Sequence, residues 1–152
     1  MKAHNGIRVL LAWTLGIVAG TAIAGGVALV LGSLVPAWST VLVPPTDFLG
    51  GSPFSNYLVP GLLLGVGVGG LHLVAFILVL KRHRLAALFA TICGFEMLIW
   101  IFVEMSIIPF SGLQVVFEAI GLLEIGLVLL ILDLIPRQRT LRARSAGIRG
   151  GQ

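Results

Sequence analysis

Four apolar runs, each long enough to cross a lipid bilayer, account for most of this chain. They cover residues 7–34, 57–80, 85–105 and 113–135. A transmembrane helix needs about 20 mainly apolar residues, because the hydrocarbon core is about 30 Å thick and a helix rises about 1.5 Å per residue. The core holds no water, so backbone polar groups must be satisfied within helices. We therefore predict an all-α integral membrane protein, in which residues 1–135 form one antiparallel bundle of four transmembrane helices.

The composition supports this class and excludes a nucleic-acid-binding protein. Of 152 residues, 58% are hydrophobic and 11% are charged, whereas a soluble domain has about 25% charged residues. Lysine and arginine outnumber the acidic residues by ten to six. These basic residues lie at the ends of the apolar runs, where they act as topology signals rather than as a nucleic-acid-binding face.

The distribution of basic residues also predicts the orientation. Lys81, Arg82 and Arg84 lie in a short turn between the second and third runs, and residues 136–152 form a basic tail. Cytoplasmic segments carry the excess of lysine and arginine, so we expect both termini in the cytoplasm. We expect the tail to be disordered and to be attracted to anionic lipids of the inner leaflet.

Two segments near the N-terminus carry mixed sequence signals. The first run is either a retained helix or a signal peptide cleaved near Ala24, and its length favours the retained helix. Prolines and glycines in Ser33–Asn56 argue against regular structure over much of that loop. Its apolar residues favour a position on the mouth of the bundle, with Trp38 and Tyr57 at the level of the lipid headgroups.

Small residues at helical spacing predict close contacts between helices. They recur every four residues in the first run and in the second, a pattern that lets helix backbones approach each other in lipid. Packing within the bundle is the simpler interpretation, and a seam with a second copy or with another membrane protein is the alternative. The predicted packing residues are Gly16, Gly20, Gly61, Gly65 and Gly69.

Glutamates within the apolar runs are the candidate functional residues. Glu96 and Glu124 each lie twelve residues from the inner end of their run, roughly 18 Å deep. His72 lies nine residues from the inner end of the second run, roughly 13 Å deep. Ionisable groups at such depths are costly and usually functional. We predict that these three residues form a proton or cation site.

A second set of polar residues falls near the opposite interface. Glu104 and Glu118 lie roughly 27 to 30 Å from the inner boundary, and Trp100 shares a helical face with Glu104. Gln114 lies one turn before Glu118. We predict that these four residues form an outer vestibule above the deeper site.

Several functions are compatible with such a glutamate cluster. The acids can serve as protonated groups that hydrogen-bond between helices, or they can support proton- or cation-coupled transport of a small solute. The alternative from another class is an accessory or scaffold subunit that does not transport. A lipid-modifying enzyme ranks third because no catalytic motif is present, and we expect no cofactor. His72 and Cys93 alone are too few ligands to predict a metal site.

One stretch resembles a known group of proteins. Ser52–Leu62 reads SPFSNYLVPGL, and Leu113–Gln114 begins the fourth run. The chain is similar over roughly residues 50 to 132 to small bacterial four-span membrane proteins with SPF-x-x-x-L-x-P-G-L at the start of the second helix. That group has no settled function. The resemblance implies a four-span topology in a bacterial plasma (inner) membrane and transfers no site residue.

Overall fold

The computed structural model describes residues 2–132, and they form helices and connecting loops without any strand. Four helical segments are long and apolar enough to cross a membrane: Asn5–Leu34, Leu58–Leu80, Ala86–Ile107 and Gly112–Ile131. The prediction of an all-α protein with four such segments is confirmed. The chain is therefore a multi-pass membrane protein. The predicted basic tail, 136–152, lies outside the described residues.

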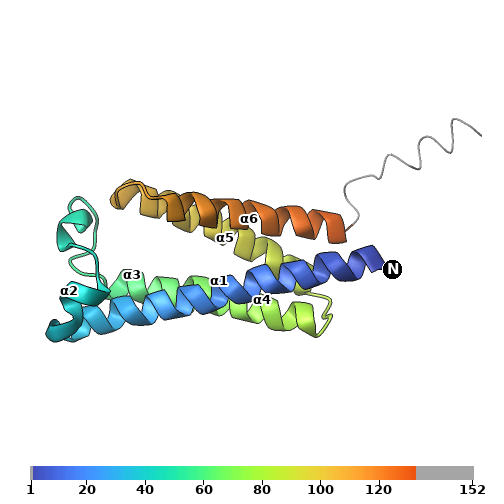
Figure 1. The fold of residues 1–152 in the computed structure, drawn as a ribbon, viewed down its shortest axis with the longest axis horizontal. Coiled ribbons are helices and arrows are strands. Elements are labelled where there is room, and N and C mark those ends of the chain that lie inside the picture. The colour runs from blue at the N-terminus through green and yellow to red at the C-terminus, as the bar shows by residue number, and fades with distance from the viewer. Residues whose placement is uncertain (1, 133–152) are drawn as a thin grey trace, which may run out of the picture.

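The four crossings pack as a ring (Figure 1). The first is α1 (Lys2–Leu34), the third is α5 (Ala86–Ile107) and the fourth is α6 (Gly112–Ile131). The second crossing has three parts, α3 (Leu58–Leu62), the π-helix η3 (Leu63–Gly69) and α4 (Gly70–Leu80). Helix α1 packs against the second crossing and α6, and α5 packs against α4 and α6. Each crossing therefore contacts two neighbours and has one face toward the interior.

The direction of the chain reverses from one crossing to the next along the long axis in Figure 1. The loop carrying α2 lies at one end, and the turn between α4 and α5 lies at the other, near the start of α1. Along α1 and the second crossing, Gly61 lies against Leu29, whereas Gly69 lies against Ile23. The residue numbers of these contacts rise in the second crossing as they fall in α1, so the two segments run in opposite directions.

The long first loop is more regular than its proline content indicated. It contains three short helices, η1 (Pro36–Trp38), α2 (Ser39–Leu42) and η2 (Thr46–Leu49). Proline is tolerated at the first positions of a helix because the N–H it lacks would have no partner there. Trp38 is exposed, but Tyr57 is buried and its hydroxyl donates a hydrogen bond of 3.0 Å to the Pro45 carbonyl. Tyr57 therefore anchors the loop to the bundle instead of facing lipid headgroups.

Glycines set the closest approach between α1 and the second crossing. A Cβ atom built on Gly26 would lie 2.5 Å from the Gly65 backbone, and one on Gly69 would lie 2.6 Å from Ile23. Because real Cβ atoms do not come this close to other atoms, side chains larger than hydrogen would push the helices apart. The predicted packing role of the glycines in the second run fits this geometry, and the sequence pattern did not identify Gly26.

The predicted glycine stripe on α1 is only partly in contact. A Cβ on Gly16 would lie 3.3 Å from the Phe76 ring, but one on Gly20 would meet no described atom within 4 Å. Gly20 and Ala24 are exposed, while Gly26 and Ala22 are buried. The interior face of α1 therefore includes Ala22 and Gly26, and Gly20 makes no packing contact within the described bundle.

The outer surface of the bundle is apolar. Large hydrophobic side chains are exposed on all four crossings, including Trp13, Val66, Phe102 and Leu113, each more than 60% exposed. A soluble protein rarely leaves so much contiguous apolar surface in water. This surface fits contact with lipid chains. Among the described residues, the interior holds other apolar side chains and three buried polar ones, His72, Gln114 and Glu124.

Candidate functional site

Three ionisable side chains from three different helices meet inside the bundle. His72 on α4 and Glu124 on α6 are both fully buried, and Glu96 on α5 is about three-quarters buried with a side-chain exposure of 23%. His72 Nε2 lies 3.4 Å from Glu124 Oε2, and His72 Nδ1 lies 3.9 Å from Glu96 Oε2. We call His72, Glu96 and Glu124 the ion cluster. These are the residues whose depths along their runs predicted a common level.

Close helix packing positions the two glutamates of the ion cluster. A Cβ on Gly94 would lie 3.0 Å from the Gly121 carbonyl oxygen, and one on Gly121 would lie 3.1 Å from the Gly94 carbonyl oxygen. Glu96 and Glu124 follow these glycines by two and three residues. The small residues therefore bring α5 and α6 near enough for both carboxyl groups to reach the histidine on α4.

A π-helical segment precedes the histidine. In η3 the helix is wider than an α-helix, and the segment contains Gly65, Gly67 and Gly69. Its Val68 carbonyl oxygen lies 2.7 Å from His72 Nδ1. Short π-helical segments occur frequently at functional sites. No feature of the hydrophobic pattern indicated this segment, although its density of glycine was visible in the sequence.

The contact with Val68 determines which nitrogen of the His72 ring carries a hydrogen. A carbonyl oxygen can only accept a hydrogen bond, so His72 Nδ1 carries a hydrogen and donates it to Val68. Nε2 is then the atom presented to Glu124. In the neutral ring this atom has a free lone pair, and in the charged ring it carries the second proton. The site therefore has one position at which a proton or another cation would lie between His72 and Glu124.

Four buried polar atoms of the ion cluster lack hydrogen-bond partners among residues 2–132. This holds for His72 Nε2, Glu96 Oε2 and both carboxyl oxygens of Glu124. A buried polar group without a partner costs about 1–3 kcal/mol, so such groups normally have one. The unpartnered nitrogen and carboxyl oxygens therefore form a site that a proton or another cation would stabilise.

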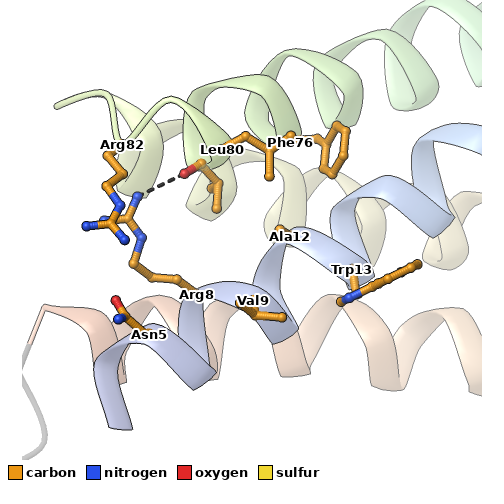
Figure 2. A pocket seen from close by; sticks show the side chains of 9 residues that line it. Asn5, Arg8, Val9, Ala12, Trp13, Phe76, Leu80 and Arg82 are labelled. Carbon is orange, nitrogen blue, oxygen red and sulfur yellow. Dashed lines mark hydrogen bonds between the residues drawn. The ribbon is translucent and has the colours of Figure 1, made fainter. Parts of the chain in front are cut away.

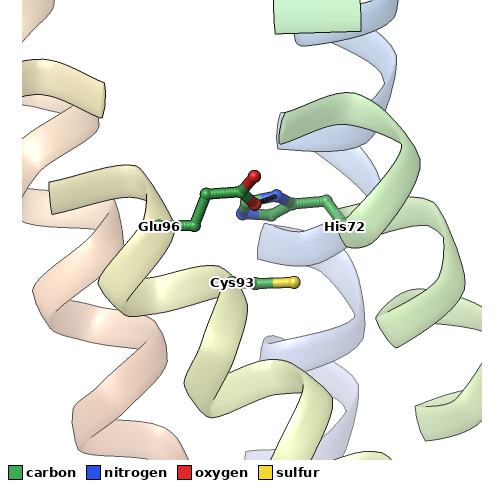
Figure 3. A group of neighbouring side chains, drawn as sticks. All are labelled: His72, Cys93 and Glu96. Atoms are coloured by element: carbon green, nitrogen blue, oxygen red, sulfur yellow. Dashed lines mark ion pairs between the residues drawn. The ribbon is translucent and has the colours of Figure 1, made fainter. Parts of the chain in front are cut away.

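A cysteine joins the ion cluster from one side (Figure 3). Cys93 is fully buried and precedes Glu96 by three residues on α5, so both side chains project toward His72. One ligand atom from each of His72, Cys93 and Glu96 lies within 4.8 Å of the others. Cys93 and Glu96 share a helical face by their spacing, but the proximity of that face to His72 depends on the packing of α4 and α5.

Two cavities lie between the ion cluster and the end of the bundle that carries the long loop. One has a volume of about 260 Å³ and the other about 250 Å³, and both are lined by Leu64, Trp100 and Glu104. The Trp100 indole Nε1 donates a hydrogen bond of 3.1 Å to Glu104 Oε2. The second cavity is also lined by Val68 and Met97. It therefore extends to residues that hold His72 or adjoin Glu96.

The other two predicted vestibule residues do not line either of these cavities. Glu118 is exposed on the surface of α6, because its position on the helix faces away from the bundle. Gln114 is buried at the start of α6, where its side-chain oxygen accepts a hydrogen bond of 2.9 Å from the Ser111 backbone N–H. Its geometry is that of a helix cap, so Trp100 and Glu104 are the predicted vestibule residues that line cavities.

A larger cavity of about 510 Å³ lies at the opposite end, near the start of α1 (Figure 2). Asn5, Arg8 and Arg82 form its polar part, and Trp13 and Phe76 contribute to its apolar wall. Arg8 donates a hydrogen bond of 2.8 Å to the Val79 carbonyl oxygen near the end of α4. The combination of arginine side chains with an adjoining apolar wall suits an anionic amphiphile at a membrane surface.

Comparison of the chain with protein-family models, curated proteins and solved structures finds no match. The chemistry of the ion cluster and the cavities beside it are therefore the features that bear on function.

Proposed function

We propose that this protein mediates proton- or cation-coupled transport of a small solute, with the ion cluster as the coupling site. The observation that carries the proposal is the burial of Glu124 beside His72 with both carboxyl oxygens unpartnered among the described residues. If the acids served only to hold helices together, their oxygens would have hydrogen-bond partners on neighbouring helices. Costly groups without a structural role at membrane depth are typical of ion pathways.

The two outer cavities supply a route toward the ion cluster. Trp100 and Glu104 line both cavities. The cavity of about 250 Å³ is also lined by Val68 and Met97, so it lies beside the ion cluster. A carboxylate in a largely apolar passage favours cations over anions. A small solute or cation entering from the loop end would meet Glu104 first and the ion cluster second.

The test uses purified protein in liposomes and the double variant Glu96→Gln/Glu124→Gln. Glutamine keeps the shape and hydrogen-bonding capacity of glutamate without an ionisable proton. We expect wild-type protein to dissipate an imposed pH gradient, read with an enclosed pH dye, and the double variant to fall to the rate of protein-free liposomes. Glu118→Gln, an exposed acid on the same helix as Glu124, is the matched control and should match the wild type.

Thermal melting in detergent separates lost function from lost folding. The double variant should melt at the wild-type temperature or higher, because removing unpartnered buried acids costs the fold little. Proton flux and pH response equal to the wild type in a folded double variant would refute coupled transport.

An accessory or scaffold subunit remains the second candidate, favoured by one observation. Gly20 and Ala24 form an exposed small-residue stripe on α1, and Gly20 has no described atom within 4 Å of its Cβ position. Such a stripe suits a helix of another membrane protein or of a second copy. A scaffold should co-purify with a partner in fixed ratio, whereas a transporter should work alone in liposomes.

The same proposal includes a location and a lipid partner. We place the protein in a bacterial plasma (inner) membrane with both termini cytoplasmic, supported by the basic residues at the run ends. The arginine-lined cavity of Figure 2 would then face the inner leaflet, where it suits the headgroup of an anionic lipid. The basic tail would strengthen this attraction, and nucleic acid is not a partner in this proposal.

A further inference from the structure

The ion cluster and Cys93 together contain four side chains able to bind a metal ion. His72 offers Nε2, Cys93 its thiol sulfur, and Glu96 and Glu124 their carboxyl oxygens. Figure 3 shows the first three converging from α4 and α5, with ligand atoms within 4.8 Å of one another. Glu124 completes the set from α6, at 3.4 Å from His72 Nε2. Sequence alone left His72 and Cys93 as isolated residues on different helices, and the fold brings them together.

We propose that His72, Cys93, Glu96 and Glu124 form a binding site for a divalent transition-metal ion of the zinc class. This inference deepens the proposed function by naming the cation, and it rests on the same site. It stands on geometry independently of transport, because binding needs no gradient across a membrane.

The histidine has the orientation of a metal ligand. Metal-binding histidines almost always donate their second ring N–H to a carbonyl or carboxylate, which fixes the ring. Here His72 Nδ1 lies 2.7 Å from the Val68 carbonyl oxygen, so Nε2 points to Glu124 with its lone pair available. Nε2 is fully buried and has no hydrogen-bond partner in the part of the chain that the structure describes.

The spacing between His72 and Glu124 also fits a shared ion better than a hydrogen bond. Their 3.4 Å separation is not accompanied by hydrogen-bond geometry, and Glu124 has no other partner among residues 2–132. In a tetrahedral zinc site with bonds of about 2.05 Å to nitrogen and about 2.1 Å to oxygen, these two ligand atoms lie about 3.4 Å apart. The ligand atoms of His72, Cys93 and Glu96 lie within 4.8 Å of one another, so binding one ion requires Glu96 and Cys93 to move closer to it.

The ligand types select the class of metal. Nitrogen, sulfur and carboxylate oxygen together suit zinc and its divalent neighbours, whereas calcium and magnesium prefer oxygen alone. Three acidic groups supply ample negative charge for a dication. The lysines and arginines of the described chain, Lys2, Arg8, Lys81, Arg82 and Arg84, all lie at helix ends. No lysine or arginine of the described chain therefore lies in the interior, where it would neutralise the glutamates in place of a bound cation.

Cobalt(II) is the probe for the test, since it replaces zinc and gives visible absorption. Full-length protein in detergent, cleared of metal with a chelator and carrying no affinity tag, is titrated with Co²⁺. Cys93 is the chain's single cysteine, so a sulfur-to-cobalt charge-transfer band would report this site alone. We expect one Co²⁺ per chain, a charge-transfer band, and its displacement by Zn²⁺ but not by Mg²⁺.

Matched variants assign the ligands. Cys93→Ser should abolish the charge-transfer band, and His72→Gln and Glu124→Gln should each weaken Co²⁺ binding at least about tenfold, as loss of metal-site residues does. His83→Gln, in the exposed turn, and Glu118→Gln, on the outer face of α6, should leave the affinity unchanged. Equal weakening by the control variants would contradict the site.

The wild-type titration decides the inference even if a ligand variant fails to fold. A wild type that melts cooperatively yet gives no charge-transfer band, or whose band Zn²⁺ does not displace, would overturn it. Flux in liposomes is measured separately, so metal binding without transport would refute only the proposed function. Transport without metal binding would refute only this inference.

Discussion

At the scale of single residues, Tyr57 shows how one polar atom ties the long loop to the bundle. The side chain is buried at the start of the second crossing, and its hydroxyl donates to the Pro45 carbonyl across twelve residues of chain. Burial raises the pKa of the Tyr57 hydroxyl above its ordinary value of 10.0. The hydroxyl therefore keeps its proton at neutral pH and remains a donor.

Replacing this hydroxyl tests the anchor. Tyr57→Phe keeps the ring but leaves the Pro45 carbonyl without its donor, so we expect a loss of about 1 kcal/mol of stability. Thermal melting in detergent measures the loss, and limited proteolysis should show faster cleavage in the loop. The control is Ser39→Ala, which removes an exposed hydrogen bond of the same loop, from Ser39 to the Pro36 carbonyl. Equal effects of the two variants would contradict the anchoring role of Tyr57.

At the scale of elements, glycine decides how closely helices approach. Hydrophobic attraction does not hold helices together in lipid, so packing depends on how near the backbones can come. Gly26 and Gly65 allow α1 and η3 to touch through their backbones, and Gly94 and Gly121 do the same for α5 and α6. The second pair also sets the positions of Glu96 and Glu124. Helix packing and the candidate site thus depend on the same small residues.

Two alanine variants of one helix separate a packed glycine from an open one. Gly26→Ala would place a methyl group 2.5 Å from the Gly65 backbone, and forced overpacking of this kind costs about 1–3 kcal/mol. Gly20→Ala adds the same methyl group where no described atom lies within 4 Å, and it should not lower stability. Thermal melting of both proteins in one detergent provides the comparison. A Gly26→Ala protein as stable as the Gly20→Ala protein would contradict the contact.

At the scale of the whole molecule, the fold separates its polar features by depth. The arginine-lined cavity lies at one end, the ion cluster lies in the interior, and the cavities lined by Trp100 and Glu104 lie toward the loop end. Exposed apolar side chains surround this axis on the outer surface. The polar features therefore follow one another along the long axis of the bundle.

The orientation across the membrane can be measured with single cysteines. Asp47→Cys lies in the long loop, and His83→Cys lies in the turn between α4 and α5, at the opposite end in Figure 1. In a Cys93→Ala background, a membrane-impermeant thiol reagent added to intact cells should label the loop cysteine. The turn cysteine should react only after the cells are opened. Labelling of both sites from outside would contradict the proposed topology.

The sequence by itself determined the number and approximate limits of the helices. An apolar run of about 20 residues forms a helix in lipid, because each of its backbone polar groups must find a hydrogen-bond partner within the same segment. Counting residues from the run ends also predicted that His72, Glu96 and Glu124 share a level, since the helical rise per residue is constant. These conclusions depend on local geometry, which the order of residues specifies directly.

Only the tertiary structure decided which faces meet. Whether Glu118 faces the interior or the lipid, whether Gly20 or Gly26 packs, and whether Cys93 reaches His72 all depend on the rotation of each helix about its axis. Apolar residues cover nearly the whole circumference of these helices, so the sequence contains little amphipathic pattern to fix that rotation. The backbone contacts between α1 and η3 and between α5 and α6 fix it instead. The π-helical segment lies directly before His72, and no local pattern of the sequence predicted it.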